Sequence, residues 1–144
     1  MAEVPVVLFL RSEQRADGEV ACMEQRTEGR FSETAEGFLL CYKEDADTGM
    51  GETETALLLC RDHALLKRSG AVETKMLFLP GERSSVSYCT DFGAVELWLE
   101  TSYLGHHLTA EGGSVMLRYS LSDRGGTVGD YTLKLHIKKK DEIA

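Results

Sequence analysis

The sequence predicts an all-β protein built from antiparallel strands. Apolar and polar residues alternate strictly in residues 131–138, and segments 115–121 and 95–100 repeat the pattern. Side chains on a strand point to opposite faces with a period of two, so each segment would bury one face and expose the other. A sheet with one buried face and one solvated face is typical of antiparallel pairing.

Turn-forming residues divide the first half of the chain into short strands. Asp17-Gly18 suits a two-residue hairpin turn, whose central positions both need positive φ. Gly29 is expected to end the second strand, and Glu36-Gly37 forms the next turn. The acidic stretch 45–51 contains two glycines and is expected to be a mobile loop. The strands expected in this half are 4–16, 19–28, 30–34 and 38–44.

The second half of the chain continues the same organisation. Asp62-His63, Ser69-Gly70 and Pro80-Gly81 are turn signals, and residues 123–126 join the last two strands. Residues 57–66 are rich in Leu, Ala and Arg, which favour helices, but their strand-like neighbours favour two strands. The strands expected in this half are 52–61, 64–68, 71–79, 83–90, 94–103, 113–122 and 127–138.

The number of strands predicts how the sheet is arranged. A chain of 144 residues fits a single domain, which we place at residues 1–144. Exposed strand edges invite aggregation, so a sheet of about ten strands must close into a barrel or fold into a sandwich. Short turns between consecutive strands favour an antiparallel up-and-down meander over Greek-key crossovers.

The net charge restricts the classes of partner. Lys and Arg total 16 against 24 for Asp and Glu, a net charge of −8. This excess repels phosphate groups and argues against binding to nucleic acid or to an anionic membrane. The basic run 138–140 follows the last expected strand and is interpreted as a solvated terminus.

Cysteine usage indicates a reduced compartment. The four cysteines lie in apolar, strand-like segments without a Cys-x-x-Cys pair, so we expect small buried hydrophobic residues rather than metal ligands. They are Cys22, Cys41, Cys60 and Cys89. The first apolar run, 4–10, has no basic residue before it and is too short for a signal peptide or a membrane span. We therefore expect a cytoplasmic protein.

An ordered set of short motifs resembles a known family. The set is Thr27-Glu28-Gly29, Tyr42-Lys43-Glu44, Arg68-Ser69-Gly70, Tyr88, Thr90, Phe92-Gly93, Thr101 and Tyr119. In this order and spacing it resembles the DUF1934 family of small, YwiB-like bacterial proteins, over nearly the whole chain. The resemblance implies a calycin-like, lipocalin-like β-barrel in a bacterial cytoplasm, without an assigned activity or catalytic residues. Trp98 departs from the family, where a polar outward residue is expected.

The barrel interior is the first place to expect a ligand. A barrel of about eight strands has room for packed side chains or for one small ligand. An Arg beside several hydroxyl groups suits a small anion, because a guanidinium binds a carboxylate through two hydrogen bonds. The candidate ligand-binding residues are Arg68, Tyr42, Glu44, Tyr88 and Thr90 near strand ends, with Thr101 and Tyr119 on inward faces. The alternative is that Arg68 pairs with Glu44 or a strand-end carbonyl and plugs the barrel.

Other reactive residues carry weaker signals. His106 and His107 are adjacent and would point apart on a strand, so we expect no metal site. A nucleophilic pair of Cys89 with either histidine is conceivable but lacks a supporting motif. Neither a phosphate-binding loop nor a nucleophile elbow is present, and we expect no cofactor. Trp98 either lies exposed at a homodimer interface or is covered by a loop, and the sequence favours neither.

Three functions remain open after these exclusions. The first is a non-enzymatic barrel that binds a small, partly apolar or anionic molecule. The second is an enzyme that uses the interior residues Arg68, Tyr88 and Tyr119. The third is a protein-interaction module that acts through the outer sheet face around Trp98.

Overall fold

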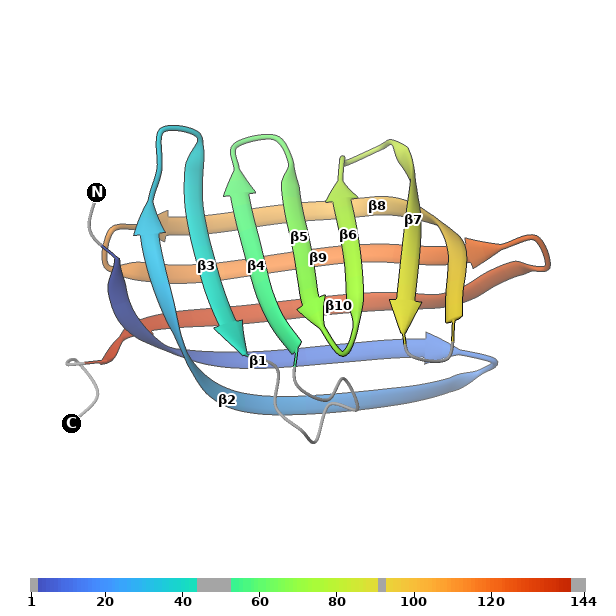
Figure 1. Cartoon of the computed structure of the whole chain (residues 1–144), viewed down its shortest axis with the longest axis horizontal. Coiled ribbons are helices and arrows are strands. Elements are labelled where there is room, and N and C mark those ends of the chain that lie inside the picture. Colours follow the sequence, from blue (N-terminus) through green and yellow to red (C-terminus); the bar gives the residue numbers. More distant parts are fainter. Residues whose placement is uncertain (1–2, 44–52, 91–92, 141–144) are drawn as a thin grey trace.

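A computed structural model describes residues 3–43, 53–90 and 93–140, and confirms the all-β prediction (Figure 1). The described residues form ten strands. They are β1 (Val4–Ala16), β2 (Glu19–Glu33), β3 (Gly37–Lys43), β4 (Thr53–Cys60), β5 (Ala64–Gly70), β6 (Glu73–Phe78), β7 (Arg83–Thr90), β8 (Gly93–Thr109), β9 (Gly112–Asp123) and β10 (Gly126–Lys139). The expected loop at 45–51 lies outside the described residues.

The strands form a closed antiparallel barrel with the expected meander topology. Each strand pairs with the next along the chain, and β1 pairs with β10 to close the ring. Asp17 and Gly18, at the first hairpin turn, have φ angles of 54° and 78°, as the two-residue turn requires. Closure gives every strand two neighbours, which is the physical advantage predicted from the number of strands.

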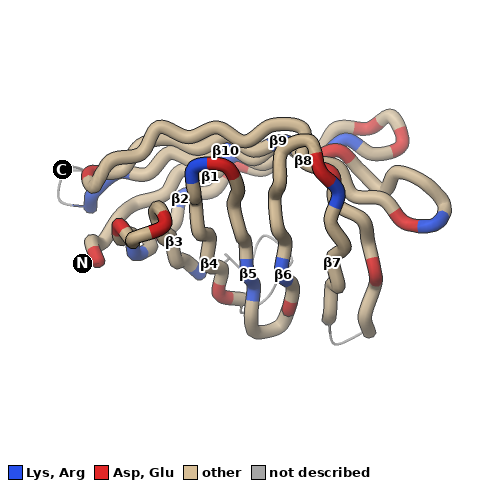
Figure 2. The backbone as a smooth tube through the Cα atoms, turned by 90° about the horizontal axis from the view of Figure 1, so that it is seen from above, with Lys and Arg blue, Asp and Glu red and all other residues tan. Residues whose placement is uncertain are grey.

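The barrel is flattened into two layers of different strand length. The long strands β1, β8, β9, β10 and most of β2 run along the molecule, and the short strands β3–β7 cross them steeply (Figures 1 and 2). We call these the long-strand layer and the short-strand layer. Their inward faces enclose the interior of the barrel.

Gly29 lies at a corner where β2 passes from one layer to the other. It pairs with Val6 of β1 and with Tyr42 of β3. A Cβ atom at Gly29 would lie 2.6 Å from the carbonyl oxygen of Cys41, so only glycine permits this close approach. The prediction that Gly29 ends the second strand is therefore wrong, because β2 continues through it to Glu33.

β8 is longer than predicted and contains a bulge. The expected strand ended at Tyr103, whereas β8 continues to Thr109. The register with β9 shifts between Thr101 and Tyr103, so one extra residue interrupts the alternation. As a result Thr101 and Leu104 both face inward, and Tyr103 faces outward.

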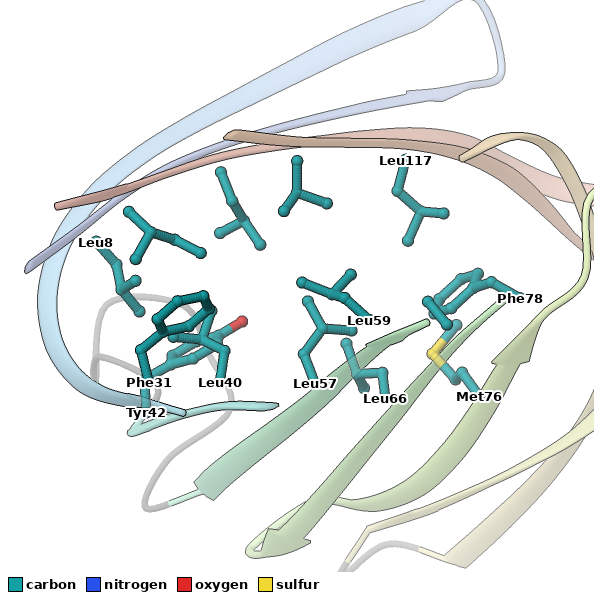
Figure 3. Close-up of a cluster of buried hydrophobic side chains, with 14 of the residues drawn as sticks. Leu8, Phe31, Leu40, Tyr42, Leu57, Leu59, Leu66, Met76, Phe78 and Leu117 are labelled. Atoms are coloured by element: carbon teal, nitrogen blue, oxygen red, sulfur yellow. The ribbon is translucent and has the colours of Figure 1, made fainter. Parts of the chain in front are cut away.

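The hydrophobic core fills one end of the space between the layers. Its largest fully buried side chains come from both layers, as Figure 3 shows for Leu8, Phe31, Leu40, Phe78 and Leu117. β1 shows where this core ends, because Val6 and Leu8 are fully buried, whereas the inward residues Leu10 and Ser12 line a cavity. The cavity therefore occupies the end of the barrel nearer the β1–β2 hairpin.

The pairing of β6 with β7 is the sparsest in the barrel. Within the described ranges, only Glu73 with Cys89 and Thr74 with Tyr88 are in register. Side chains supply further contacts: Thr74 Oγ1 donates to the carbonyl oxygen of Ser87 at 3.1 Å, and Ser84 Oγ donates to that of Leu77 at 2.9 Å. Two strand residues beside this seam, Phe78 and Val86, line the cavity.

The cysteines are free, as expected, but most are not buried. Cys60 is buried, Cys41 and Cys89 are partly buried, and Cys22 is exposed. The expectation of four buried thiols is wrong because Cys22 lies on the part of β2 that projects beyond the core. Across residues 3–43, 53–90 and 93–140, no helix is long and apolar enough to cross a membrane.

Candidate ligand-binding cavity

A cavity of about 460 Å³ lies between the two layers. Its floor is apolar and includes Leu10, Leu66, Met76, Phe78, Val86, Leu97, Leu121 and Leu133. Four of the predicted ligand-binding residues line the same cavity: Tyr42, Arg68, Tyr88 and Tyr119. The structure thus brings together residues that are up to 77 positions apart in the sequence.

Strand register explains how the short-strand layer contributes three of these residues. Opposite residues on neighbouring strands point to the same face of a sheet. The register places one inward row across five strands: Tyr42, Thr55, Arg68, Thr74 and Tyr88. We call this the Arg68 row. Arg68 lies at its centre, between the buried hydroxyl-bearing residues Thr55 and Thr74.

The long-strand layer contributes an aromatic wall. Tyr119 of β9 pairs in register with Tyr131 of β10, and their rings stack with centroids 5.1 Å apart. Phe78 of β6 meets the ring of Tyr119 edge-on at 5.0 Å, from the opposite layer. This aromatic contact joins the two layers and fixes the orientation of the Tyr119 ring.

Burial controls the ionisation of the cavity tyrosines. Burial raises the pKa of Tyr119 to about 12, and the nearby charge of Arg68 opposes that rise. Burial also raises the pKa of Tyr131, with a smaller contribution from Tyr88. Both phenols are therefore protonated at neutral pH and can donate hydrogen bonds to a ligand.

Arg68 supplies the positive charge of the cavity. It is the one cationic side chain among the described residues that line it. Glu13, the one carboxylate in the described part of the lining, accepts a hydrogen bond from Arg15 Nε at 3.3 Å at the protein surface. An anion in the cavity would therefore meet a guanidinium and several phenolic hydroxyls, whereas a cation would meet only the Glu13 carboxylate among the acidic groups of the described lining.

Gln25 adds a polar group that sequence reasoning missed. Its side-chain amide nitrogen is buried and has no hydrogen-bond partner among the residues that the structure describes. Gln25 lines the cavity from β2. Tyr131 was also missed as a cavity residue. It has the same period-two spacing as the inward residues Leu133 and Leu135, and this spacing could have placed it on the interior face.

The remaining predicted residues do not line the cavity in the described structure. Thr101 is buried beside Tyr119 in the register, and its hydroxyl has no hydrogen-bond partner within the described ranges. Thr90 ends β7, but its side chain is outside the described part of the structure. Glu44 lies outside the described residues, so its expected pairing with Arg68 stays a prediction.

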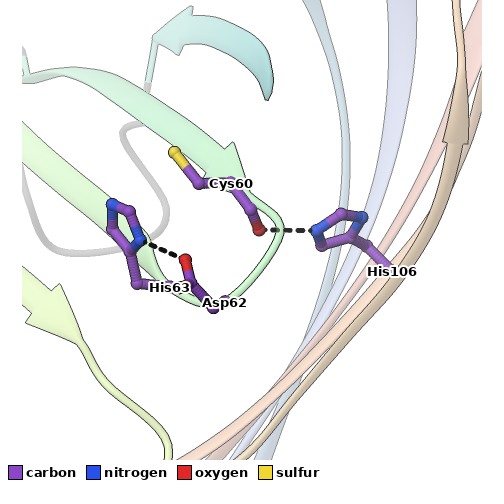
Figure 4. Close-up of polar contacts among 4 residues, drawn as sticks. All are labelled: Cys60, Asp62, His63 and His106. Atoms are coloured by element: carbon purple, nitrogen blue, oxygen red, sulfur yellow. Dashed lines mark hydrogen bonds and ion pairs between the residues drawn. The ribbon is translucent and has the colours of Figure 1, made fainter. Parts of the chain in front are cut away.

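The histidines lie away from this cavity. His106 faces inward, and its Nε2 donates a hydrogen bond to the carbonyl oxygen of Cys60 at 2.9 Å (Figure 4). His107 faces outward, as the alternation requires. His63 Nδ1 contacts Asp62 at 2.8 Å, and this hydrogen bond lowers the pKa of the Asp62 carboxyl.

The structure separates Cys89 from His106 and His107, the two histidines that are neighbours in the sequence. Cys89 pairs with Ala94 near the start of β8, whereas His106 lies twelve residues further along that strand. Twelve strand residues span about 40 Å. The nucleophilic pairing of Cys89 with His106 or His107 is therefore wrong.

Trp98 is exposed on the outer face of the sheet. Its exposed fraction is 45%, and the guanidinium carbon of Arg83 lies 4.5 Å from the ring centroid. The alternative that the segment around His106 covers this ring is wrong, because that segment continues the same strand.

The family comparison agrees with the fold. The model of the family described as "Domain of unknown function (DUF1934)" matches residues 9–135. The chain belongs to the DUF1934 family. It is similar to the crystal structure of the ywiB protein from Bacillus subtilis, with 27% sequence identity and a TM-score of 0.80. That similarity covers 93% of this chain and 92% of the other, while no curated protein matches. The predicted membership in DUF1934 and its lipocalin-like closed barrel are confirmed.

Proposed function

We propose that this DUF1934 protein binds a small, partly apolar anion inside its barrel and does not transform it. The observation that carries the proposal is one cavity of about 460 Å³ in which Arg68 and three predicted tyrosines surround an apolar floor. Ligand cavities commonly combine apolar walls with a few convergent polar groups. The ligand is expected to be small enough to fit this cavity volume of about 460 Å³.

The charge of the ligand follows from the polar groups. Arg68 is partly buried, so its attraction for an anion is screened less than that of a surface cation. A guanidinium also matches the geometry of a carboxylate. Tyr88 and Tyr119 can donate to the same anion, and the amide nitrogen of Gln25 supplies a donor that lacks a partner within the described residues.

The ionisation of Tyr119 argues against its use as a general base. A general base must be unprotonated near the working pH. Burial holds the pKa of Tyr119 near 12, which keeps its phenol protonated. The proposal includes a cytoplasmic location, in keeping with the four unpaired cysteines.

Binding of decanoate, a small carboxylate with an apolar chain, tests the proposal. Isothermal titration calorimetry would compare the wild type with Arg68→Met and with Lys67→Met. Lys67 is the matched control because it precedes Arg68 on β5 but is exposed on the opposite face. We expect Arg68→Met to weaken decanoate binding about tenfold or more, as for the loss of a charge-assisted hydrogen bond. We expect Lys67→Met to bind decanoate as the wild type does.

Equal decanoate affinity in the two variants would refute the role of Arg68. Native mass spectrometry of the full chain, purified from a bacterial lysate, gives an independent measurement. A small anionic molecule that is retained by the wild type and lost in Arg68→Met would support the proposal. A wild type that retains no small molecule and gives no heat with decanoate would overturn it.

A further inference from the structure

A second hollow lies on the outer face of the long-strand layer. Its volume is about 730 Å³, and side chains from β1, β2, β8, β9 and β10 line it. Register places two outward rows across these five strands. The first row is Arg26, Phe9, His136, Ser114 and His107. The second row is Glu24, Arg11, Lys134, Met116 and Gly105. We call this surface the outer groove.

The outer groove and the interior cavity are on opposite faces of the same sheet. Leu8 and Leu10 flank Phe9 along β1 and face the interior, so Phe9 points outward. Leu135, which lies between Lys134 and His136, is buried in the same way. Leu10 and Gln25 line both spaces, so the two ligands would lie on opposite sides of the same part of the sheet.

The outer groove has the composition of a protein-binding surface. Aromatic residues, Met and Arg are enriched where proteins meet, and flexible Met side chains adapt to partners. Phe9 is 38% exposed and Tyr103 is 48% exposed. The guanidinium carbon of Arg26 lies 5.8 Å from the centroid of the Phe9 ring, so an aromatic ring and a cation are presented together.

Gly105 lets Tyr103 form one wall of the outer groove. A Cβ atom at Gly105 would lie 2.6 Å from the hydroxyl oxygen of Tyr103, so the tyrosine ring lies across the strand above the glycine. Any larger residue at position 105 would push the ring aside. The bulge in β8 is what turns Tyr103 to the outer face.

The outer groove is cationic on an acidic protein. Among the residues that the structure describes, its lining includes Arg11, Arg26 and Lys134 against the one carboxylate of Glu24, so the local balance is +2 while the whole chain carries −8. Within the part of the chain that the structure describes, no ion pair engages Arg26 or Lys134. These two charges are therefore available to a partner.

We propose that the outer groove docks an extended acidic peptide segment of a partner protein. Its carboxylates would lie against Arg26 and Lys134, and an apolar side chain would contact Phe9 and Met116. Five strands spaced about 4.8 Å apart span roughly 19 Å, the length of about six extended residues. A second copy related by a twofold axis would place one cationic groove against another, and the acidic chain as a whole repels nucleic acid.

Fluorescence anisotropy with a labelled acidic peptide tests this docking. The probe is an eight-residue peptide of Glu and Asp with a central Leu, and the salt concentration is varied. The test variant combines Arg26→Glu with Lys134→Glu. The matched control combines Lys67→Glu with Lys75→Glu, two exposed lysines that are paired in register on the short-strand layer. Both variants make the same change in total charge.

We expect the wild type and the control variant to bind the peptide with similar affinity. The groove variant should bind it at least tenfold more weakly, and the wild-type affinity should fall as salt increases. Equal weakening in the two variants would overturn the proposal, since it would show a response to total charge alone. The proposal would also fail if the wild type does not bind the peptide, prefers a single-stranded oligonucleotide, or forms a dimer that only the groove variant dissociates.

Discussion

Ionisation of Tyr119 should couple the stability of the barrel to alkaline pH. The pKa of this phenol rises from 10 to about 12 on folding. Between these values the unfolded chain has released the proton and the folded chain retains it. The stabilisation is therefore fully present below roughly pH 10 and is lost as pH rises toward 12. Two pKa units correspond to about 3 kcal/mol of unfolding free energy.

Urea denaturation at a series of pH values would measure this effect. Other groups also titrate in alkali, so the useful quantity is the difference between the wild type and Tyr119→Phe. The wild type should lose about 2 kcal/mol more than Tyr119→Phe between roughly pH 9 and pH 12, and the remainder above pH 12. The exposed Tyr103 provides a control, because Tyr103→Phe should follow the wild type. Parallel pH profiles for the wild type and Tyr119→Phe would show that Tyr119 is not desolvated as described.

Two further substitutions test the corner of β2 and the outer face of β8. Gly29→Ala should lower the unfolding free energy by about 1–3 kcal/mol, because the new Cβ would lie 2.6 Å from the carbonyl oxygen of Cys41. Gly125→Ala, in the turn after β9, should change it by less than about 0.5 kcal/mol in the same urea assay, and equal losses would contradict the steric argument. Trp98→Glu should convert a homodimer formed through this face into a monomer in native mass spectrometry. An unchanged oligomeric mass would remove support for that interface.

The sequence predicted the fold where the alternation was uninterrupted. The pattern from Tyr131 to Ile137 identifies β10 and its inward face. The prediction failed at Gly29 because a glycine can mark a corner as well as a strand end. It also failed beyond Tyr103, where the bulge shifts the inward positions from Thr101 to Leu104 and breaks the period of two. A sequence pattern with a fixed period of two cannot predict such a shift in register.

The candidate cavity was predicted only in part, because the alternation of residues does not show which strands are neighbours. Tyr42, Arg68 and Tyr88 could be placed near strand ends, but only the register shows that they share one row. Gln25 was missed because β2 lacks a clear alternation of apolar and polar residues around it. Inward residues such as Ala21 and Met23 do not differ consistently in polarity from their outward neighbours. Sequence periodicity identifies faces of strands, whereas a site also depends on which strands lie opposite each other.

The pairing of β1 with β10 has a consequence for biogenesis. It runs over ten positions, from Val6 with Lys139 to Arg15 with Asp130. During synthesis β1 leaves the ribosome first and β10 last. The β1 edge of the β1–β2 hairpin therefore stays unpaired until almost the whole chain has been synthesised. Contacts this distant in sequence form slowly, and an unpaired edge readily recruits strands from other chains. Nascent chains held near one another on a polysome would therefore compete with β10 for the same edge, and a chaperone that covers β1 would favour the monomeric closure.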